Sequence, residues 1–465
     1  MLDKAAGADT LAAVERGTGM ADFRVCLIGA GAGGLSMARA LQRRGIAYDH
    51  FERHANVGGI WDQQNPGSPM YDSAHMISSR TQSGFIGFPM PESYPDYPSH
   101  RQILAYLRSF ADAYDLKPHI AFGTEVSRAE KQGERWTVTL GDGSQHRYDA
   151  LIAATGLAWH PRMPSYPGSF AGEIIHSSTY RSPEIFRGKR VLVIGAGNSG
   201  VDIASDAART SERTLISLRR GYHFIPKHVF GKPADVFAKA GAMMPMRFQQ
   251  WTFALLLRLL NGDVTRYGLK KPDHLPLSSH PIVNSSALQA MAHGDLVPKP
   301  DVERFDGNEV VFKDGSRESV DLIVAATGYI HKVPFVDPGL IASNGVESDL
   351  FLRSLSRRDP TFGAIGFVEV NGSVNPIYDE FSDVIAAYLA ERKAGSAKAA
   401  EFERIARSGA YSVAGAVNYV DSPRHHVYAN VAASLKAVKK LRRRLGWRAP
   451  RADEMRPPSA AKKAA

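Results

Sequence analysis

Two short apolar runs along the chain each lead into a glycine-rich turn and then into a helix-like pattern. Residues 23–28 predict a strand that ends at the glycine turn 29–34, and residues 35–44 predict a helix after it. Residues 190–194 lead in the same way into a second glycine turn at 195–200. A strand, a glycine turn and a helix in this order predict the start of a dinucleotide-binding fold.

The same plan returns at the end of each half. An Asp-Gly-Ser sequence, which favours a tight hairpin turn, precedes an apolar strand at 149–156 and another at 321–328. The glycine turns lie 166 residues apart and the hairpin turns lie 172 residues apart. Because two independent landmarks keep nearly the same spacing, the sequence predicts two copies of one architecture.

The first glycine turn carries the residue types that bind a dinucleotide. Gly29 permits the tight turn, Gly31 lets backbone amides approach a pyrophosphate, and Gly34 lets the helix pack closely on the sheet. The next strand ends at Glu52, 18 residues beyond Gly34, where a carboxylate accepts hydrogen bonds from ribose hydroxyls. A further pair of glycines allows a second close approach, which suits the extended dinucleotide FAD. The candidate residues here are Gly29, Ala30, Gly31, Ala32, Gly33, Gly34, Glu52, Arg53, Gly59, Ile60 and Trp61.

The second copy differs at the end of its second strand. Arg219 and Arg220 stand where a ribose-binding acid would otherwise be. Guanidinium groups bind a 2′-phosphate through charge-assisted hydrogen bonds, so this pair favours NADPH over NADH; the competing interpretation is a solvated basic strand end. The candidate residues of this unit are Gly195, Gly197, Asn198, Ser199, Gly200, Asp202, Arg219 and Arg220.

Charge and cysteine content narrow the class of protein. The net charge is +10, but the basic residues are scattered except near the carboxyl end, so we expect no nucleic-acid partner. Cys26 is the single cysteine, which excludes dithiol flavoenzymes and is typical of a reducing, cytoplasmic setting. Its apolar neighbours predict that it is buried.

One stretch is apolar enough to raise the question of a membrane. Residues 251–260 are interrupted by Arg258 and fall short of the roughly 20 residues that span a bilayer. We expect a buried or interfacial helix without membrane contact. The alternative is monotopic contact through Phe248, Trp251, Phe253 and Leu256.

These observations predict an α/β protein with two Rossmann-like dinucleotide-binding domains, the NADPH domain being inserted into the FAD domain. Prolines after the first closing strand mark one crossing between the domains. The expected division is a flexible leader at 1–22, the first part of the FAD-binding domain at 23–165, the NADPH-binding domain at 166–328 with a helical insertion near 235–270, a return to the FAD domain at 329–450, and a disordered basic tail at 451–465.

The segment between the two glycine turns carries a family pattern. Phe170, Gly172, His176 and Tyr180 reproduce F-x-G-x-x-x-H-x-x-x-[FY], and residues 23–450 resemble the flavin-containing monooxygenases of the N,N-dimethylaniline type. Baeyer-Villiger monooxygenases share the first half of the pattern but usually carry Trp at the last position. The resemblance implies further cofactor-binding positions at Met76, Ile77, Val126, Ala154, Thr155, Gly156, Tyr180, Thr327 and Gly328.

The resemblance also implies a reaction. NADPH reduces FAD, NADP⁺ stays bound, and O₂ forms a C4a-hydroperoxyflavin that oxygenates a soft nitrogen or sulfur of a small organic substrate. This chemistry belongs to the flavin and requires no catalytic nucleophile and no metal. Members of the family usually carry an asparagine near the flavin, where the gapless match places Ile77 between Met76 and Ser78. Isoleucine cannot hydrogen-bond a peroxide, so efficient amine oxygenation stays open.

Two alternatives follow from these residues. The first is a Baeyer-Villiger-type or NADPH-oxidase activity, which is motivated by Ile77. The second is a non-catalytic nucleotide-binding redox sensor, for which the basic carboxyl end is the only positive support. The expected partners are a small-molecule substrate and O₂; the sequence indicates no oligomeric state, although a homodimer is compatible with it.

Overall fold

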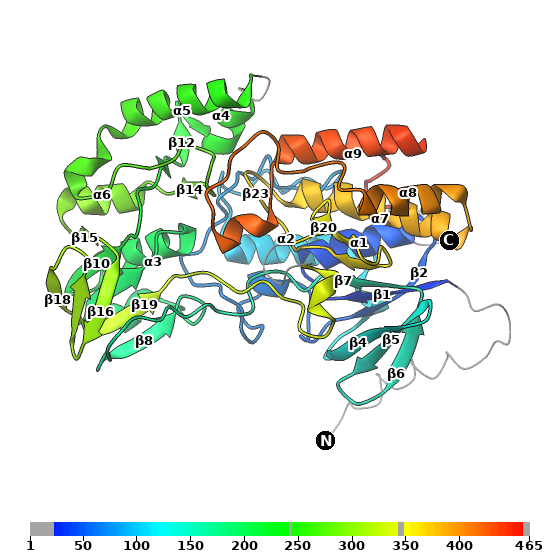
Figure 1. Ribbon diagram of the computed structural model, residues 1–465, viewed down its shortest axis with the longest axis horizontal. Helices are drawn as coiled ribbons and strands as arrows, with labels where there is room; N and C mark the ends of the chain where they lie inside the picture. The colour runs from blue at the N-terminus through cyan, green and yellow to red at the C-terminus, as the bar shows by residue number, and fades with distance from the viewer. Residues whose placement is uncertain (1–22, 241–243, 343–347, 459–465) are drawn as a thin grey trace.

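Two sheets of mainly parallel strands organise the molecule and lie toward opposite ends of its long axis (Figure 1). The computed structural model describes residues 23–240, 244–342 and 348–458. The first sheet has the strand order β20-β21-β22-β7-β1-β2-β3, and the second has the order β15-β10-β9-β19-β8. This arrangement confirms the α/β class and the two Rossmann-like units.

The first sheet is built from both ends of the chain. Its core strand β1 pairs in parallel with β2 and with β7, and Ile28 lies opposite both Phe51 and Ala153. Late strands then extend the sheet, because β22 pairs in parallel with β7. The strands are β1 (Arg24–Ile28), β2 (Ala47–Phe51), β3 (Ile120–Ala121), β7 (Ala150–Ala153), β20 (Leu350–Phe351), β21 (Leu355–Ser356) and β22 (Phe362–Ala364).

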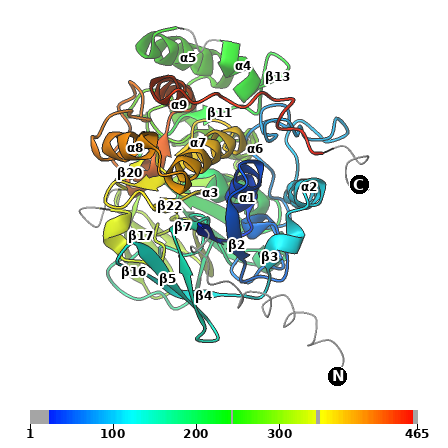
Figure 2. The ribbon, with the colours of Figure 1, turned by 90° about the vertical axis from the view of Figure 1, so that its right-hand side faces the viewer.

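Helices from both ends of the chain also pack together on this sheet. Figure 2 shows α7 (Asn375–Lys393) beside α1 (Ala32–Arg43). A buried ion pair joins them: Arg39 Nη2 lies 2.5 Å from Asp379 Oδ1, and both side chains are at most 1% exposed. The other helices of this unit are α2 (His100–Ala113), α8 (Ala397–Arg407) and α9 (Val431–Leu445).

The second sheet repeats the plan of the first without help from distant segments. Asp149 and Asp321 stand just before the closing strands, and each accepts a 2.8 Å hydrogen bond from the backbone amide that opens the central strand. An antiparallel three-stranded sheet precedes each closing strand, as the two Asp-Gly turns predict. The elements are β4 (Val126–Gln132), β5 (Arg135–Leu140), β6 (Gln145–Tyr148), β8 (Glu173–His176), β9 (Arg190–Ile194), α3 (Asn198–Ala208), β10 (Arg213–Ser217), α6 (Ser286–His293), β15 (Leu296–Lys299), β16 (Val302–Asp306), β17 (Glu309–Phe312), β18 (Arg317–Ser319) and β19 (Leu322–Ala325).

A helical insertion follows β10, and its longest helix has two apolar faces. Helix α5 (Met246–Asn261) buries Leu257 and packs Phe253 against the cluster beneath it. On the outer face, Phe248, Trp251 and Leu259 are 50–75% exposed. The expected buried or interfacial helix therefore lies at the surface, along the upper edge in Figure 1 with α4 (Ala234–Ala240). None of the helices in the described ranges is long and apolar enough to cross a bilayer.

The carboxyl end differs from the disordered tail expected from residue 451 onward. Met455 is 2% exposed, and its carbonyl oxygen accepts a hydrogen bond from the Tyr114 hydroxyl. Two charged residues of this segment also form an ion pair, since Arg451 lies 2.5 Å from Asp453. Within residues 451–458, the buried Met455 holds this segment against the amino-terminal unit. The expected leader at 1–22 and the last residues, 459–465, lie outside the described residues.

Candidate cofactor-binding sites

The first glycine turn brings the start of α1 directly against the end of β1. Gly29 has a φ of 99°, and a Cβ atom there would lie 2.6 Å from the carbonyl oxygen of Ala154. A Cβ atom at Gly34 would collide with the carbonyl oxygen of Gly29. Neither position can carry a side chain, and the two glycines therefore let α1 begin at the edge of the sheet. The backbone amides at the amino end of α1 favour anionic groups there.

A cavity of about 360 Å³ extends from this turn. It collects most of the residues expected to bind the first dinucleotide. The lining residues among them are Gly29, Gly31, Ala32, Gly33, Glu52, Arg53, Gly59, Ile60, Trp61, Met76, Val126, Ala154, Thr155 and Gly156. Ala30 and Gly34 lie behind the turn and shape it.

Polar groups in this cavity are arranged for a ligand. Glu52 is 6% exposed, and its carboxylate accepts hydrogen bonds from the backbone amides of Ala30 at 2.6 Å and His54 at 2.8 Å. The hydroxyl of Thr155 is buried and has no hydrogen-bond partner among the described residues. A buried hydroxyl without a partner is costly unless a ligand completes it. A flavin dinucleotide fits this site, because its ribose hydroxyls and pyrophosphate match the carboxylate and the glycine amides.

Several lining residues could not be found from the sequence motifs. The indole ring of Trp159 stacks with Arg53, whose guanidinium carbon lies 4.5 Å from the ring centroid. From the late segment come Glu369, Asn375 and Tyr378. Trp159 lies six residues after the end of the closing strand β7, and this proximity was the one available signal. The late residues carried none, because only the completed tertiary structure brings them to the cavity.

The second glycine turn has the same geometry as the first. Gly195 has a φ of 107°, and a Cβ atom there would lie 2.5 Å from the carbonyl oxygen of Ala326. Gly200 approaches the carbonyl oxygen of Gly195 as Gly34 approaches Gly29. Helix α3 begins after Gly197, its N-cap, and Ser199 is exposed in its first turn. This end of α3 is therefore open to an anionic ligand.

Three residues that were expected to bind a cofactor form hydrogen bonds within the protein. Tyr180 is 1% exposed, and its hydroxyl donates a 2.9 Å hydrogen bond to Asp206, so it has no surface for a cofactor. The Asn198 amide bonds to the backbone of Pro281 and Val283, 3.0 Å each, which anchors the insertion.

Asp202 is the third of these residues. Its carboxylate accepts hydrogen bonds from Asn284 at 2.7 Å and from Tyr71 at 3.1 Å, and burial raises its pKa. The sequence pattern placed Asn198 and Asp202 at the second glycine turn but could not show which partners their side chains contact.

The basic pair and the closing strand complete the second unit. Arg219 is exposed just beyond β10, and Nη2 of Arg220 lies 3.5 Å from Asp273. After β19, the Thr327 hydroxyl donates to the Arg162 carbonyl. The Gly328 carbonyl accepts from Nε2 of His176 at 3.0 Å, which ties the closing strand to the linker.

Ile77 does not line the cavity, although its neighbour Met76 does. Its half-buried side chain packs with Ile225, Leu257 and Val283 of the helical insertion. The residue therefore fills an apolar contact between the amino-terminal unit and the insertion.

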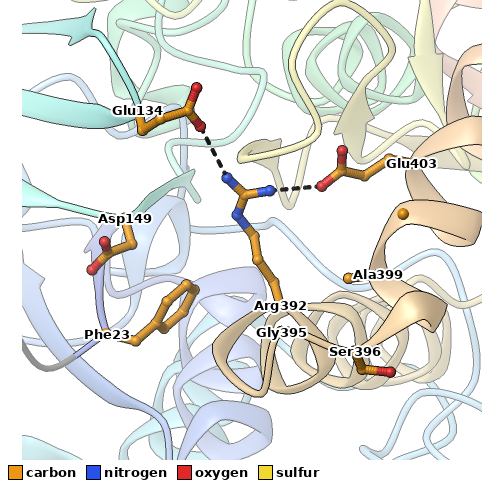
Figure 3. Close-up of a pocket in the computed structure, with 9 residues that line it drawn as sticks. Phe23, Glu134, Asp149, Arg392, Gly395, Ser396, Ala399 and Glu403 are labelled. Atoms are coloured by element: carbon orange, nitrogen blue, oxygen red, sulfur yellow. Dashed lines mark hydrogen bonds and ion pairs between the residues drawn. The ribbon is translucent and has the colours of Figure 1, made fainter.

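A second cavity, of about 440 Å³, contains no residue of either glycine turn (Figure 3). Arg392 lies at its centre and pairs with Glu403 at 2.7 Å and Glu134 at 3.4 Å. Because its one guanidinium is already held by carboxylates, we regard this cleft as a junction between α7–α8 and the β4–β6 sheet. No group of three His, Cys, Asp or Glu side chains in the described ranges could hold a metal ion.

Comparisons with known proteins agree with this geometry. A family model described as flavin-binding monooxygenase-like matches residues 22–392. Flavin-containing monooxygenase 5 of Homo sapiens is 32% identical over 384 residues, which cover 77% of this chain and 72% of the human protein. The probable indole-3-pyruvate monooxygenase YUCCA9 of Arabidopsis thaliana is 32% identical over 323 residues, which cover 66% of this chain and 75% of the plant protein.

Solved structures show the same fold. The flavin-containing monooxygenase from Stenotrophomonas maltophilia has a TM-score of 0.62 at 25% identity and covers 80% of this chain and 99% of its own. The structure of OTEMO in complex with FAD and NADP has a TM-score of 0.65 at 19% identity, with coverage of 91% and 97%. The repeated glycine-turn units, the family match across most of the chain and these relatives together show that the chain belongs to the flavin-binding monooxygenase-like family, whose members are oxidoreductases.

Proposed function

We propose that this protein is an NADPH- and O₂-dependent flavoprotein monooxygenase that oxygenates a soft nitrogen or sulfur atom of a small organic substrate. The observation that carries the proposal is a pair of glycine turns with the same geometry. The strands that follow them end in residues of opposite charge. The first strand ends in a buried carboxylate at Glu52, and the second ends in Arg219 and Arg220. This contrast matches two different dinucleotides, FAD and NADPH.

The residues of the first cavity would hold FAD in a defined way. The backbone of Gly31 and Gly33 at the amino end of α1 would bind the pyrophosphate, and Glu52 would accept hydrogen bonds from the ribose. When bound, reduced FAD supplies the activation of O₂. Trp61, Met76 and other apolar side chains of the lining would keep water away from that chemistry.

Anaerobic mixing of the FAD-loaded protein with NADPH tests the proposal directly. NADPH should bleach the visible absorbance of the flavin, and admission of air with a substrate should restore it and yield oxygenated product. A panel of amines, thioethers and ketones, with hydrogen peroxide measured in parallel, separates oxygenation at N or S from Baeyer-Villiger and oxidase activity. A flavin that never accepts hydride from NADPH would contradict the proposal.

The basic pair should decide between the two nicotinamide dinucleotides. Replacing Arg219 and Arg220 with alanine should raise the Kd of NADPH by about 10- to 100-fold, because a hydrogen bond to a charged group contributes about 1.5–3 kcal/mol. The Kd of NADH should change little, since NADH has no 2′-phosphate. Fluorescence titration with both nucleotides measures the two changes, and equal losses would exclude this role.

Ile77 should affect stability more than chemistry. Ile77→Asn places an amide in an apolar cluster, where an unpaired polar group costs about 1–3 kcal/mol, so the thermal midpoint should fall. Because the side chain does not line the cavity, the share of NADPH electrons released as peroxide should stay the same. A clear decrease in peroxide would instead show that this position faces the reacting oxygen.

A further inference from the structure

Arg424 lies between the two glycine-turn sites although it comes from the carboxyl-terminal part of the chain. It stands in the 3₁₀ helix Pro423–Val427, and its Nε donates a hydrogen bond to the Glu369 carboxylate. Glu369 lines the first cavity. On the other side, Nη1 of Arg424 lies 3.7 Å from the position that a Cβ atom at Gly197 would occupy. One guanidinium therefore bonds to a wall of the first site and lies beside the N-cap of α3 in the second.

The surrounding backbone fixes this placement. Strand β23 (Glu369–Val370) pairs in parallel with β24 (Tyr428–Ala429), which directly follows the helix that carries Arg424. The ladder holds Glu369 on one strand and fixes the end of the 3₁₀ helix that carries Arg424 beside it. Arg424 nevertheless stays accessible, since 39% of its side chain is exposed.

Arg424 is the cation beside Glu369, because the pKa values of the neighbouring His280 and His425 are lowered. Nδ1 of His280 lies 3.7 Å from the Glu369 carboxylate, but burial, followed by the charge of Arg424, lowers the pKa of His280 to about 3. His425 accepts a 3.1 Å hydrogen bond from the His280 amide, and burial lowers its pKa too. Although burial of Glu369 acts to raise its pKa, the Arg424 guanidinium holds that pKa below its usual value.

Glu369 pairs with Arg424 on the side of the first cavity, but on the other side the guanidinium faces the amino end of α3, which is unfavourable unless a further anion lies between them. The amino end of a helix carries a partial positive charge, and the first turn of α3 has no acidic residue to offset it. Both the helix amides and the guanidinium would bind a phosphate, the guanidinium through charge-assisted hydrogen bonds. An anion between the two would turn a repulsive contact into two attractive ones.

We infer that Arg424 is a ligand for the pyrophosphate of the nicotinamide dinucleotide, and that Glu369 positions it from the side of the flavin site. This inference rests on the proposed function and extends it to a residue outside both glycine motifs. Because NADPH and NADH share the pyrophosphate, Arg424 should contribute equally to both. That property separates it from Arg219 and Arg220, which are proposed to contact the 2′-phosphate alone.

The test compares binding of NADP⁺ and NAD⁺ to the full-length, FAD-loaded protein by isothermal titration calorimetry, without turnover. Arg424→Gln should raise both dissociation constants by the same factor, about 10- to 100-fold for the loss of one charged contact. Arg424→Lys should retain part of the affinity. Arg404→Gln, on the outside of α8, is the matched loss of one positive charge and should change neither constant.

Each outcome decides the inference. Unchanged affinities in Arg424→Gln, or a loss confined to NADP⁺, would overturn it. If Arg424→Gln loses FAD, Glu369→Gln serves instead: it keeps the guanidinium and removes the carboxylate that positions it, so the dissociation constants of NADP⁺ and NAD⁺ should rise by the same factor. Unchanged constants, or a loss confined to NADP⁺, would overturn the inference. Failure of the unaltered protein to bind NADP⁺ would count against the proposed function itself, whereas normal binding with an unaffected Arg424→Gln counts against Arg424 alone.

Discussion

Gly31→Val should produce a folded protein that does not retain FAD. The backbone at Gly31 is extended, with φ −78° and ψ −173°, so valine is tolerated there without strain. Its Cβ atom would lie 3.5 Å from Cα of Gly59, and its methyl groups would occupy the space where the backbones of Gly31 and Gly59 approach each other. Because the pyrophosphate needs that approach, the purified variant should be colourless while its circular dichroism spectrum matches that of the unaltered protein.

The equivalent position in the second unit provides the control. Gly197 is the N-cap of α3, with φ −66° and ψ 172°, and a Cβ atom there would meet only Nη1 of Arg424 at 3.7 Å. Gly197→Val should therefore keep its FAD and lose anaerobic bleaching by NADPH. The two variants exchange their phenotypes if the cofactor assignment is reversed, and retention of FAD by both would contradict the assignment of the first cavity.

Asp379→Ala should be the most destabilising single substitution at the contact of α1 with α7. The Asp379 carboxylate holds Arg39 at 2.5 Å, the Ser36 hydroxyl at 2.7 Å and the Ile86 amide at 2.6 Å. Its removal leaves a buried guanidinium without its partner, which typically costs about 3–5 kcal/mol. Urea denaturation, monitored by the intrinsic fluorescence of the protein, should show a correspondingly lower urea concentration at the unfolding midpoint.

Two further variants define that effect. Glu184→Ala breaks an exposed ion pair with Arg187 and should leave the midpoint nearly unchanged. Replacing both partners with apolar residues, as in Arg39→Met with Asp379→Leu, should recover much of the loss, because no uncompensated charge then remains. If Asp379→Ala unfolds at the same urea concentration as the unaltered protein, the pair is not a determinant of stability.

The sequence was most informative where a short segment determines its own structure. The turns at Gly29 and Gly195 were predictable because strand, glycine spacing and helix are consecutive in the chain. Each closing strand was found from its Asp-Gly turn for the same reason. The expectation of two copies of one architecture followed from the nearly equal spacing of these landmarks rather than from any single residue.

Side-chain direction and long-range contacts were beyond sequence reasoning. Tyr180 belongs to the family pattern, yet it is buried against Asp206, and no local signal indicates which way it points. Glu369 and Tyr378 reach the first cavity only because β22 and α7 return to the first sheet. The composition of the tail favours disorder and gave no signal that Met455, within residues 451–458, would be buried.

The split construction of the first sheet has a consequence for synthesis of the protein. A ribosome releases β1, β2 and β7 long before β22, which pairs with β7, and before α7, whose Asp379 neutralises Arg39. The inserted unit, by contrast, finds all five strands of its sheet between Glu173 and Ala325. Since segments fold as they emerge, we expect the inserted unit to fold first. Until β22 is synthesised, β7 of the amino-terminal unit has no partner on one side. A nascent chain that stops before α7 would thus carry a native nucleotide fold joined to an aggregation-prone half.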